Sequence, residues 1–333
     1  MKILVCGGAG YIGSHMVMEL LESSLMKFEP VVFDNLEVGH RAAVPSDAEF
    51  IQGDMRNPDD LERVFLNRGI EAVIDFSAYT LVGESCADPM KYFKNNTSSV
   101  YNLLEVMNRH DVGNIVFSST AAVYGIPETL PATEESATMP INPYGESKLG
   151  AEKALKWADF SHGIRYAALR YFNVAGAHPS GNIGEDHFPE SHLIPNILFA
   201  ARDSSTFTMS GTGYNTPDGT CIRDYVHVCD LAAAHVYALK YIIDGKVSDT
   251  FNIGTGAGFS NMQIFKEAES VVGKKIDLKI GAKRPGDPDE LIAWASKIAE
   301  KTGWTPKCSN LEEIIASAYK WHTTHPRGYD DKK

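Results

Sequence analysis

The chain opens with a glycine-rich loop set directly between a short apolar run and an amphipathic one. Lys2–Cys6 predicts a buried strand, and Ser14–Leu21 predicts a helix. Gly7, Gly10 and Gly13 have the spacing of a dinucleotide-binding loop: the first permits a tight turn, the second lets a pyrophosphate approach the backbone, and the third lets the helix pack on the strand. The amino terminus of the helix then offers free N–H groups to the anion.

A carboxylate stands where such a loop requires its partner. The apolar run Val31–Phe33 ends at Asp34, 21 positions after Gly13, where an acidic side chain binds the hydroxyls of the adenosine ribose. Because a carboxylate repels a 2′-phosphate, the sequence predicts NAD rather than NADP, with Asn35 as a neutral second contact. A glycine loop alone is often only a tight turn, but strand, loop, helix and acidic strand end together favour the cofactor site.

Hydroxyl, phenol and amine groups between Ser118 and Lys148 are spaced for removing a proton from an alcohol. Tyr144 and Lys148 are one helical turn apart, and Pro143 marks the helix start. An ammonium beside a phenol stabilises the phenolate and lowers the tyrosine pKa, although such a pair is also common on a solvated helix face. The strand-like run Asn114–Phe117 ends at Ser118, and element ends line the clefts of open α/β sheets, so we predict a catalytic pair.

The fold class follows from the alternation of strand-like and helical runs along the first half of the chain. We predict an α/β protein, a Rossmann-like doubly wound parallel sheet with a smaller mixed α/β substrate lobe. A length of 333 residues suits two such units. The predicted domains are residues 1–174, with 223–257 returning to them, and 175–333.

Charge and cysteine content exclude several classes of protein. A net charge of −12 without clustered basic residues argues against nucleic-acid binding. No apolar run reaches membrane-spanning length, so we expect no membrane partner and a cytoplasmic location. No metal site is predicted: the histidines His192 and His227 are assigned hydrogen-bonding roles, since no second ligand is recognised at metal spacing. The five cysteines lack a paired motif and are expected to be reduced: Cys6, Cys86, Cys221, Cys229 and Cys308.

The combined motifs resemble the extended short-chain dehydrogenases/reductases, nearly end to end. Within that family, the combination of the 82–85 segment with the Arg223 and Arg284 segments is similar to members that invert C4 of a UDP-hexose. The motifs that carry the resemblance lie at 7–15, 34–36, 53–54, 81–85, 118–120, 142–148, 170–176, 218–220, 223–228, 251–254 and 284–287.

The resemblance implies a reversible oxidation with NAD bound throughout. Tyr144 would take the proton from the sugar 4-hydroxyl while hydrogen leaves C4, and the 4-keto sugar would turn over before hydrogen returns on its other face. Thr120 would share the hydrogen bond to the reacting oxygen, and Lys148 would also bind the nicotinamide ribose. A homodimer formed through helices is implied as well.

Two sets of site residues follow, partly from the residues themselves and partly from the resemblance. Guanidinium groups suit a diphosphate, so Arg223 and Arg284 are assigned to UDP, the alternative being surface ion pairs. The cofactor set is Gly7, Gly10, Tyr11, Ile12, Gly13, Asp34, Asn35, Asp54 (at the adenine), Phe76, Asn95, Ser118, Tyr144, Lys148 and Tyr171. The UDP-sugar set is Thr120, Asn173, Leu193, Arg223, Tyr225, Arg284 and Asp287.

The sequence departs from the family pattern at a few positions. Asp75 stands where many relatives carry histidine, and Thr80 where some carry lysine or serine. Leu291 occupies the place of a bulky tyrosine that narrows the sugar pocket in some relatives, which leaves N-acetylated sugars open as substrates.

Three other functions are weighed against C4 inversion. A 4,6-dehydratase needs an acidic pair after Thr120, but Ala121 and Ala122 follow it and cannot move protons. A UDP-uronate decarboxylase stays open, although no second carboxylate clamp is evident. An NAD-binding sensor without turnover is disfavoured because Tyr144 and Lys148 are both present.

Overall fold

The computed structural model describes residues 1–283 and 288–331, so Arg284 and Asp287 lie outside the described residues. Seven parallel strands form one large sheet in the order β10-β6-β5-β4-β1-β2-β3, and the order reverses between β1 and β4. A reversal of this kind opens a crevice at the carboxyl ends of the strands. The strands are β1 (Lys2–Cys6), β2 (Glu29–Asp34), β3 (Glu49–Gln52), β4 (Ala72–Asp75), β5 (Asn114–Thr120), β6 (Arg165–Tyr171) and β10 (Asp249–Ile253).

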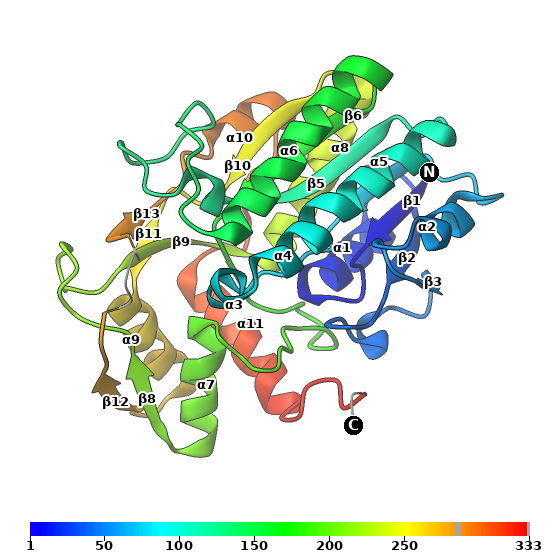
Figure 1. Ribbon diagram of the computed structural model, residues 1–333. Helices are drawn as coiled ribbons and strands as arrows, with labels where there is room; N and C mark the ends of the chain where they lie inside the picture. The colour runs from blue at the N-terminus through cyan, green and yellow to red at the C-terminus, as the bar shows by residue number, and fades with distance from the viewer. Residues whose placement is uncertain (284–287, 332–333) are drawn as a thin grey trace.

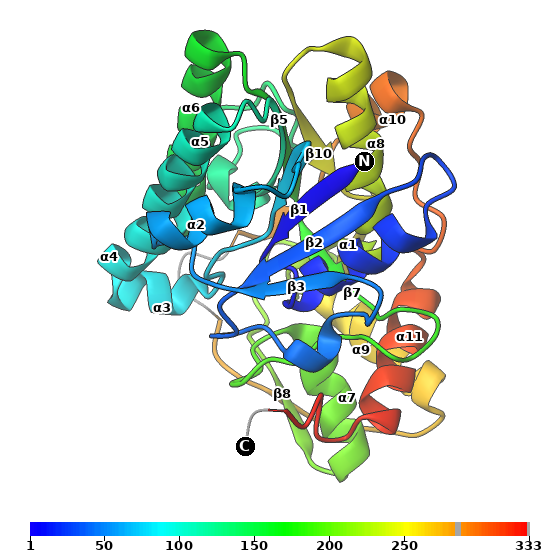
Figure 2. The same ribbon diagram turned by 90° about the vertical axis from the view of Figure 1, so that its right-hand side faces the viewer.

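Helices cover both faces of the large sheet (Figure 2), which confirms the doubly wound fold. Because both faces are buried, strands such as β1 and β4 are apolar without alternation. One helical layer contains α1 (Tyr11–Glu22), α8 (Val228–Gly245) and α10 (Ser296–Thr302), and the other contains α2 (Pro58–Phe65), α5 (Ser99–Arg109) and α6 (Pro143–His162).

Helix α6 begins at Pro143, as the sequence predicted, and ends at His162. The Asn142 side chain accepts a hydrogen bond from the Gly145 N–H at 2.9 Å, Pro143 occupies the first turn, and Gly163 ends the helix with φ +70°. These signals extend α6 to residues 143–162 and place Tyr144 in its first turn. Short helical segments fill other connections: η1 (Arg41–Ala43), α3 (Val82–Ala87), α4 (Pro89–Tyr92), η2 (Phe93–Ser98) and η3 (Ala121–Tyr124).

A smaller lobe lies beside the carboxyl end of the large sheet (Figure 1). Its central strand β9 (Ile222–His227) pairs with β7 (Asn173–Ala175), β11 (Gly258–Ser260) and β13 (Glu290–Leu291), so residues 222–227 lie in the lobe's sheet and only the following α8 and β10 join the large one. None of the helices in the described ranges combines the length and apolarity of a membrane crossing. The remaining lobe elements are β8 (Thr206–Met209), β12 (Asp277–Ile280), α7 (Leu193–Asp203), α9 (Asn261–Val272) and α11 (Leu311–Thr324).

A buried ion pair fastens α6 to the sheet. Both Glu152 oxygens accept bonds from Arg170 of β6, at 2.9 and 2.6 Å, and Ser119 of β5 also bonds to Glu152. Arg170 donates further to the Tyr124 hydroxyl at 3.1 Å, and that hydroxyl donates to Asn252 of β10 at 2.6 Å. With its charges paired in this way, the network fixes the middle of α6 against β5 and β6.

Candidate functional site

The glycine loop between β1 and α1 has the geometry of an anion cradle. Gly7 has φ +71°, and a Cβ on Gly13 would lie 2.1 Å from the Gly7 carbonyl oxygen, so only glycine allows α1 to start this close to β1. A Cβ on Gly10 would meet only the Gly7 oxygen, at 3.3 Å, which leaves its outer side open. No side chain caps the first turn of α1, whose N–H groups therefore suit a pyrophosphate.

Asp34 has a structural role that sequence reasoning missed. Its Oδ2 accepts the Ala9 N–H of the glycine loop at 3.0 Å, and its Oδ1 accepts the Leu36 N–H at 2.8 Å. Asp34 thus holds the loop in shape as well as standing at the end of β2. Next to it, the Asn35 amide donates to Asp54 Oδ2 at 3.2 Å, so the ribose and adenine candidates are in direct contact.

A charged network surrounds Asp54. Its other members, Glu37, Arg56 and Tyr79, were not predicted from the sequence. Arg56 bonds to Asp54, to Glu37 at 2.8 Å and to the Tyr79 hydroxyl at 3.1 Å. The bonds from Arg56 hold the pKa of the Asp54 carboxyl below its usual range. Only the fold reveals this group, because Glu37, Arg56 and Tyr79 follow three different strands.

Asn95, expected near the cofactor, lies in the π-helical segment η2. The Asn95 amide donates to Asn96 Oδ1 at 3.0 Å, and Asn96 exchanges two bonds with the Tyr79 backbone, at 2.9 and 3.0 Å. Asn96 also donates to Ser147 of α6 at 3.1 Å. Since π-helical turns often mark functional sites, this buried amide is a support that the sequence pattern did not reveal.

Tyr144 and Thr120 meet where α6 begins and β5 ends. The Tyr144 side chain is buried beside the ring of Tyr92, with 6.4 Å between centroids. Burial raises the pKa of Tyr144, while a hydrogen bond from the Thr120 hydroxyl lowers it. The Thr120 oxygen in turn accepts the Ala122 N–H at 3.1 Å, which orients the hydroxyl. The Thr120 hydroxyl is therefore one contact that favours the phenolate. The role expected for Lys148 from the spacing stays a prediction.

Lys148 lies one turn further along α6 and is almost fully buried, with its Nζ 4.5 Å from the centre of the Phe117 ring. Burial lowers the pKa of Lys148 to about 8, and the nearby carboxylates Asp75 and Glu152 oppose that shift. Asp75 is buried too, and burial raises its pKa. Its Oδ1 accepts two bonds from Ser77, at 2.9 and 2.5 Å, but its Oδ2 has no hydrogen-bond partner among the described residues.

The remaining cofactor candidates line the ends of β4, β5 and β6. Ser118 and the Tyr171 hydroxyl form a hydrogen bond, and burial raises the pKa of Tyr171. Phe76 packs on His235 of α8 with 4.7 Å between ring centroids, and Tyr171 contacts the same imidazole at 6.3 Å. His235 is thus a buried support beneath the crevice that the sequence did not single out.

Apart from Thr120 at the end of β5, the described candidates for the UDP-sugar lie on the lobe. Asn173 and Tyr225 are register partners on β7 and β9, and burial raises the pKa of Tyr225. Arg223, also on β9, donates to the carbonyls of Ile222 at 2.7 Å and of Pro288 at 2.9 Å. The structure describes one further member of this set, Leu193, at the start of α7.

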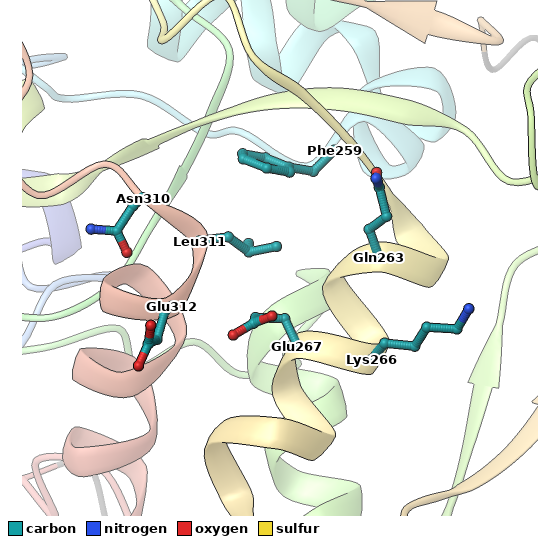
Figure 3. A pocket seen from close by; sticks show the side chains of 7 residues that line it. All are labelled: Phe259, Gln263, Lys266, Glu267, Asn310, Leu311 and Glu312. Atoms are coloured by element: carbon teal, nitrogen blue, oxygen red, sulfur yellow. The ribbon is translucent and has the colours of Figure 1, made fainter.

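Tyr11 connects the lobe with the glycine-loop helix, because its hydroxyl donates to the Gly176 carbonyl at 2.6 Å. The shallow groove in Figure 3 lies elsewhere, between α9 and α11, and it shares no residue with the predicted site. It is lined by Phe259, Gln263, Lys266, Glu267, Asn310, Leu311 and Glu312.

Comparison with known proteins gives this geometry a family context. The profile of the "NAD dependent epimerase/dehydratase family" matches residues 3–254. A "UDP-glucose 4-epimerase" of Streptococcus mutans is 53% identical, and the match covers 100% of both chains. A UDP-glucose 4-epimerase structure from Brucella ovis, in complex with NAD, is 42% identical with a TM-score of 0.91, covering 96% of this chain and 97% of that one. A UDP-glucose 4-epimerase structure from Bifidobacterium longum, with NAD+ and UDP, is 37% identical with a TM-score of 0.90, covering 98% and 100%.

The buried imidazole beneath the crevice predicts sensitivity to acid. Burial lowers the pKa of His235 from 6.5 to about 4. Between pH 6.5 and pH 4, His235 is therefore protonated in the unfolded chain and neutral in the folded chain. Stability from this group is complete above pH 6.5 and is lost as the pH falls toward 4, by at most about 1.4 kcal/mol per pH unit. We expect the substitution His235→Leu to flatten the pH dependence of the free energy of unfolding, measured by denaturant titration. The control substitution His162→Leu, at an exposed position, should leave it unchanged, and equal slopes in all three proteins would contradict the assignment.

Proposed function

The chain belongs to the NAD dependent epimerase/dehydratase family, and from that premise we propose that it interconverts UDP-glucose and UDP-galactose by inverting C4. It is an NAD-dependent isomerase. The observation that carries the proposal is the buried Tyr144 phenol, bonded to Thr120 and one turn from Lys148, at the same sheet edge as the glycine loop. A base for an alcohol at this edge would lie beside a dinucleotide site, which supports the proposal. The similarity to UDP-glucose 4-epimerases extends over the whole chain.

The residues that would hold NAD come from the ends of six strands, β1 to β6, and from η2 and α6. The glycine loop with Tyr11 and Ile12 receives the pyrophosphate, Asp34 and Asn35 the adenosine ribose, and Asp54 the adenine. Phe76, Asn95, Ser118 and Tyr171 surround the nicotinamide half, and Lys148 donates to its ribose. When bound, NAD supplies an acceptor for the hydrogen and the electron pair of C4 and then gives them back, so that no external reductant is consumed.

Tyr144 handles the proton in both halves of the reaction. As a phenolate it removes the proton of the sugar 4-hydroxyl, and as a phenol it returns the proton once the 4-keto sugar presents its other face. Thr120 steadies the reacting oxygen and stabilises the phenolate. A group that must act as both base and acid needs a pKa that suits both steps. At Tyr144, burial raises the pKa and the hydrogen bond from Thr120 lowers it.

UDP is assigned to the lobe. Arg223 offers its guanidinium to the diphosphate, with Asn173, Leu193 and Tyr225 around the nucleotide; Arg284 and Asp287 keep this assignment from the sequence alone. The carbonyls of Ile222 and Pro288 hold two arginine nitrogens in place, which preorganises the group. The corresponding division of the chain gives residues 1–174, α8, β10 and α10 to the NAD-binding domain and the rest to the UDP-sugar lobe. We propose a cytoplasmic location.

We expect Tyr144→Phe to lower turnover by about 10²- to 10⁴-fold while NAD stays bound, because only the acid–base group is lost. The measurement follows UDP-galactose deuterated at C4 becoming UDP-glucose without added reductant, with the label retained. Tyr166→Phe is the matched control, because Tyr166 lies at the amino end of β6, away from the proposed site. This variant should have a normal turnover rate. A near-normal rate for Tyr144→Phe would remove it as the base, and loss of label to solvent in the unsubstituted enzyme would remove the oxidation–reduction route.

The cofactor preference can be tested at Asp34, whose carboxylate both braces the loop and faces the ribose position. Asp34→Ala should weaken NAD binding and narrow the NAD/NADP affinity ratio by roughly 10-fold or more, since charged hydrogen bonds contribute about 1.5–3 kcal/mol. Asp34→Asn removes the charge but retains an oxygen for the loop. If both affinities fell equally in both variants, Asp34 would act through the loop alone.

We infer a homodimer formed through α5 and α6. Both helices expose apolar rings, with Tyr101 at 47%, Trp157 at 66% and Phe160 at 82% exposure, and single chains rarely leave such groups uncovered together. Sedimentation equilibrium should give twice the chain mass. Trp157→Glu should shift the protein toward the monomer, whereas Leu66→Glu, an exposed apolar position at the end of α2, should not. A monomer in the unsubstituted protein would contradict the inference.

A further inference from the structure

A compact group of two imidazoles and two carboxylates lies in the loop before α7, outside the proposed catalytic site. One ligand atom from each of Glu185, His187, Glu190 and His192 can be chosen so that all four lie within 4.8 Å of one another. The sequence predicted no metal site because no second ligand was recognised near His192. The proposal below departs from that expectation, since three potential ligands precede His192 within seven positions and the loop folds them together.

The spacing of the ligand atoms is close to that of a tetrahedral metal site. His187 Nδ1 lies 3.2 Å from Glu185 Oε1 and 3.8 Å from Glu190 Oε2. His192 Nδ1 lies 2.8 Å from an oxygen of each of the same carboxylates. Four ligands at about 2.0–2.1 Å from a zinc ion would be separated by about 3.3 Å, so small side-chain movements suffice.

A second observation indicates a bound cation. The Glu190 side chain is 6% exposed, and its Oε2 is buried without a hydrogen-bond partner among the described residues. This is the Glu190 oxygen that lies nearest to His187. A buried carboxylate oxygen without a donor is costly, and an ion between the four side chains would satisfy it.

Side chains of α1, of α11 and of the segment after α11 anchor the loop. The Trp321 indole donates to the Glu185 carbonyl at 2.8 Å, and the Tyr329 hydroxyl bonds to the backbone of Gly184 at 3.0 and 3.1 Å. On the other side, the His187 ring packs edge-on against Tyr11 of α1 at 6.2 Å. The loop therefore connects the start of α7 to the glycine-loop helix.

We propose that Glu185, His187, Glu190 and His192 bind one divalent transition-metal ion of the zinc type. Two imidazoles and two carboxylates are ligands that zinc accepts, and two negative charges neutralise the ion. Its role is structural: it fixes Leu193 and α7 relative to α1, and thereby one wall of the proposed UDP-sugar site to the cofactor loop. The competing description is a cluster of ion pairs alone.

The test uses the full-length protein after removal of metals with a chelator, and its readouts are independent of catalysis. Calorimetric titration with ZnCl₂ should give one ion per chain and a concentration-dependent rise in melting temperature. Co²⁺ in place of Zn²⁺ should give the strong visible absorption of a four-coordinate site. MgCl₂ should bind far more weakly, since magnesium prefers oxygen ligands.

Two variants locate the ion. His187→Ala and Glu190→Gln should each lose more affinity for Zn²⁺ than the roughly 10–100-fold that follows removal of an outer-shell partner. His110→Ala is the matched control, because it breaks a single histidine–glutamate pair of 2.6 Å with Glu62 and should leave binding unchanged. The group would be only an ion-pair cluster if the unsubstituted protein did not bind one Zn²⁺ per chain, or if both variants bound Zn²⁺ as tightly as the unsubstituted protein. The titration and the cobalt spectrum of the unsubstituted protein decide the question even if a variant fails to fold.

Discussion

The close contact between Gly13 and the carbonyl of Gly7 is the constraint on which the rest of the site depends. With a separation of only 2.1 Å for an added Cβ, no other residue allows α1 to start immediately above the end of β1. The amino terminus of α1 then faces the crevice where the strand order reverses. Asp34 locks this arrangement by accepting the Ala9 N–H, so the loop is shaped before any ligand binds.

The proposed catalytic pair and its neighbour Asp75 illustrate how burial changes the pKa values of side chains. Tyr144, Lys148 and Asp75 are all buried at the carboxyl ends of the strands. Burial favours the neutral form of each: it raises the pKa of Tyr144 and Asp75 and lowers the pKa of Lys148. Lys148 and Asp75 offset this for one another across the crevice floor, while Thr120 does so for Tyr144. Asp75 thus acquires a defined electrostatic partner in this chain, where the family resemblance only marked it as a departure from histidine.

The lobe has its own hydrophobic core, but contacts with the first helix of the large sheet's domain set its position. The Tyr11 hydroxyl bonds to Gly176, and the loop of residues 185–192 contacts the same tyrosine ring through His187. Both contacts lie between the start of the cofactor helix and the segment that leads into α7. A metal ion in that loop would strengthen this connection without taking part in the chemistry.

The sequence by itself determined the parallel α/β class, the glycine loop, the acidic end of β2 and the Tyr144–Lys148 pair, because each depends on local spacing or on the two-residue and 3.6-residue periods of strands and helices. Groups assembled from distant segments were beyond it: the Arg56 network, the Asn96 brace, His235 under Phe76, and the pairing of β9 with the lobe's sheet. The group of Glu185, His187, Glu190 and His192 is local, yet the sequence did not bring it together, since residues 185–192 have no regular secondary structure from which side-chain directions could be inferred. Tertiary structure alone decided burial as well, because burial depends on how distant segments pack. It raises the pKa of Tyr144, while the Thr120 hydroxyl from another element lowers it.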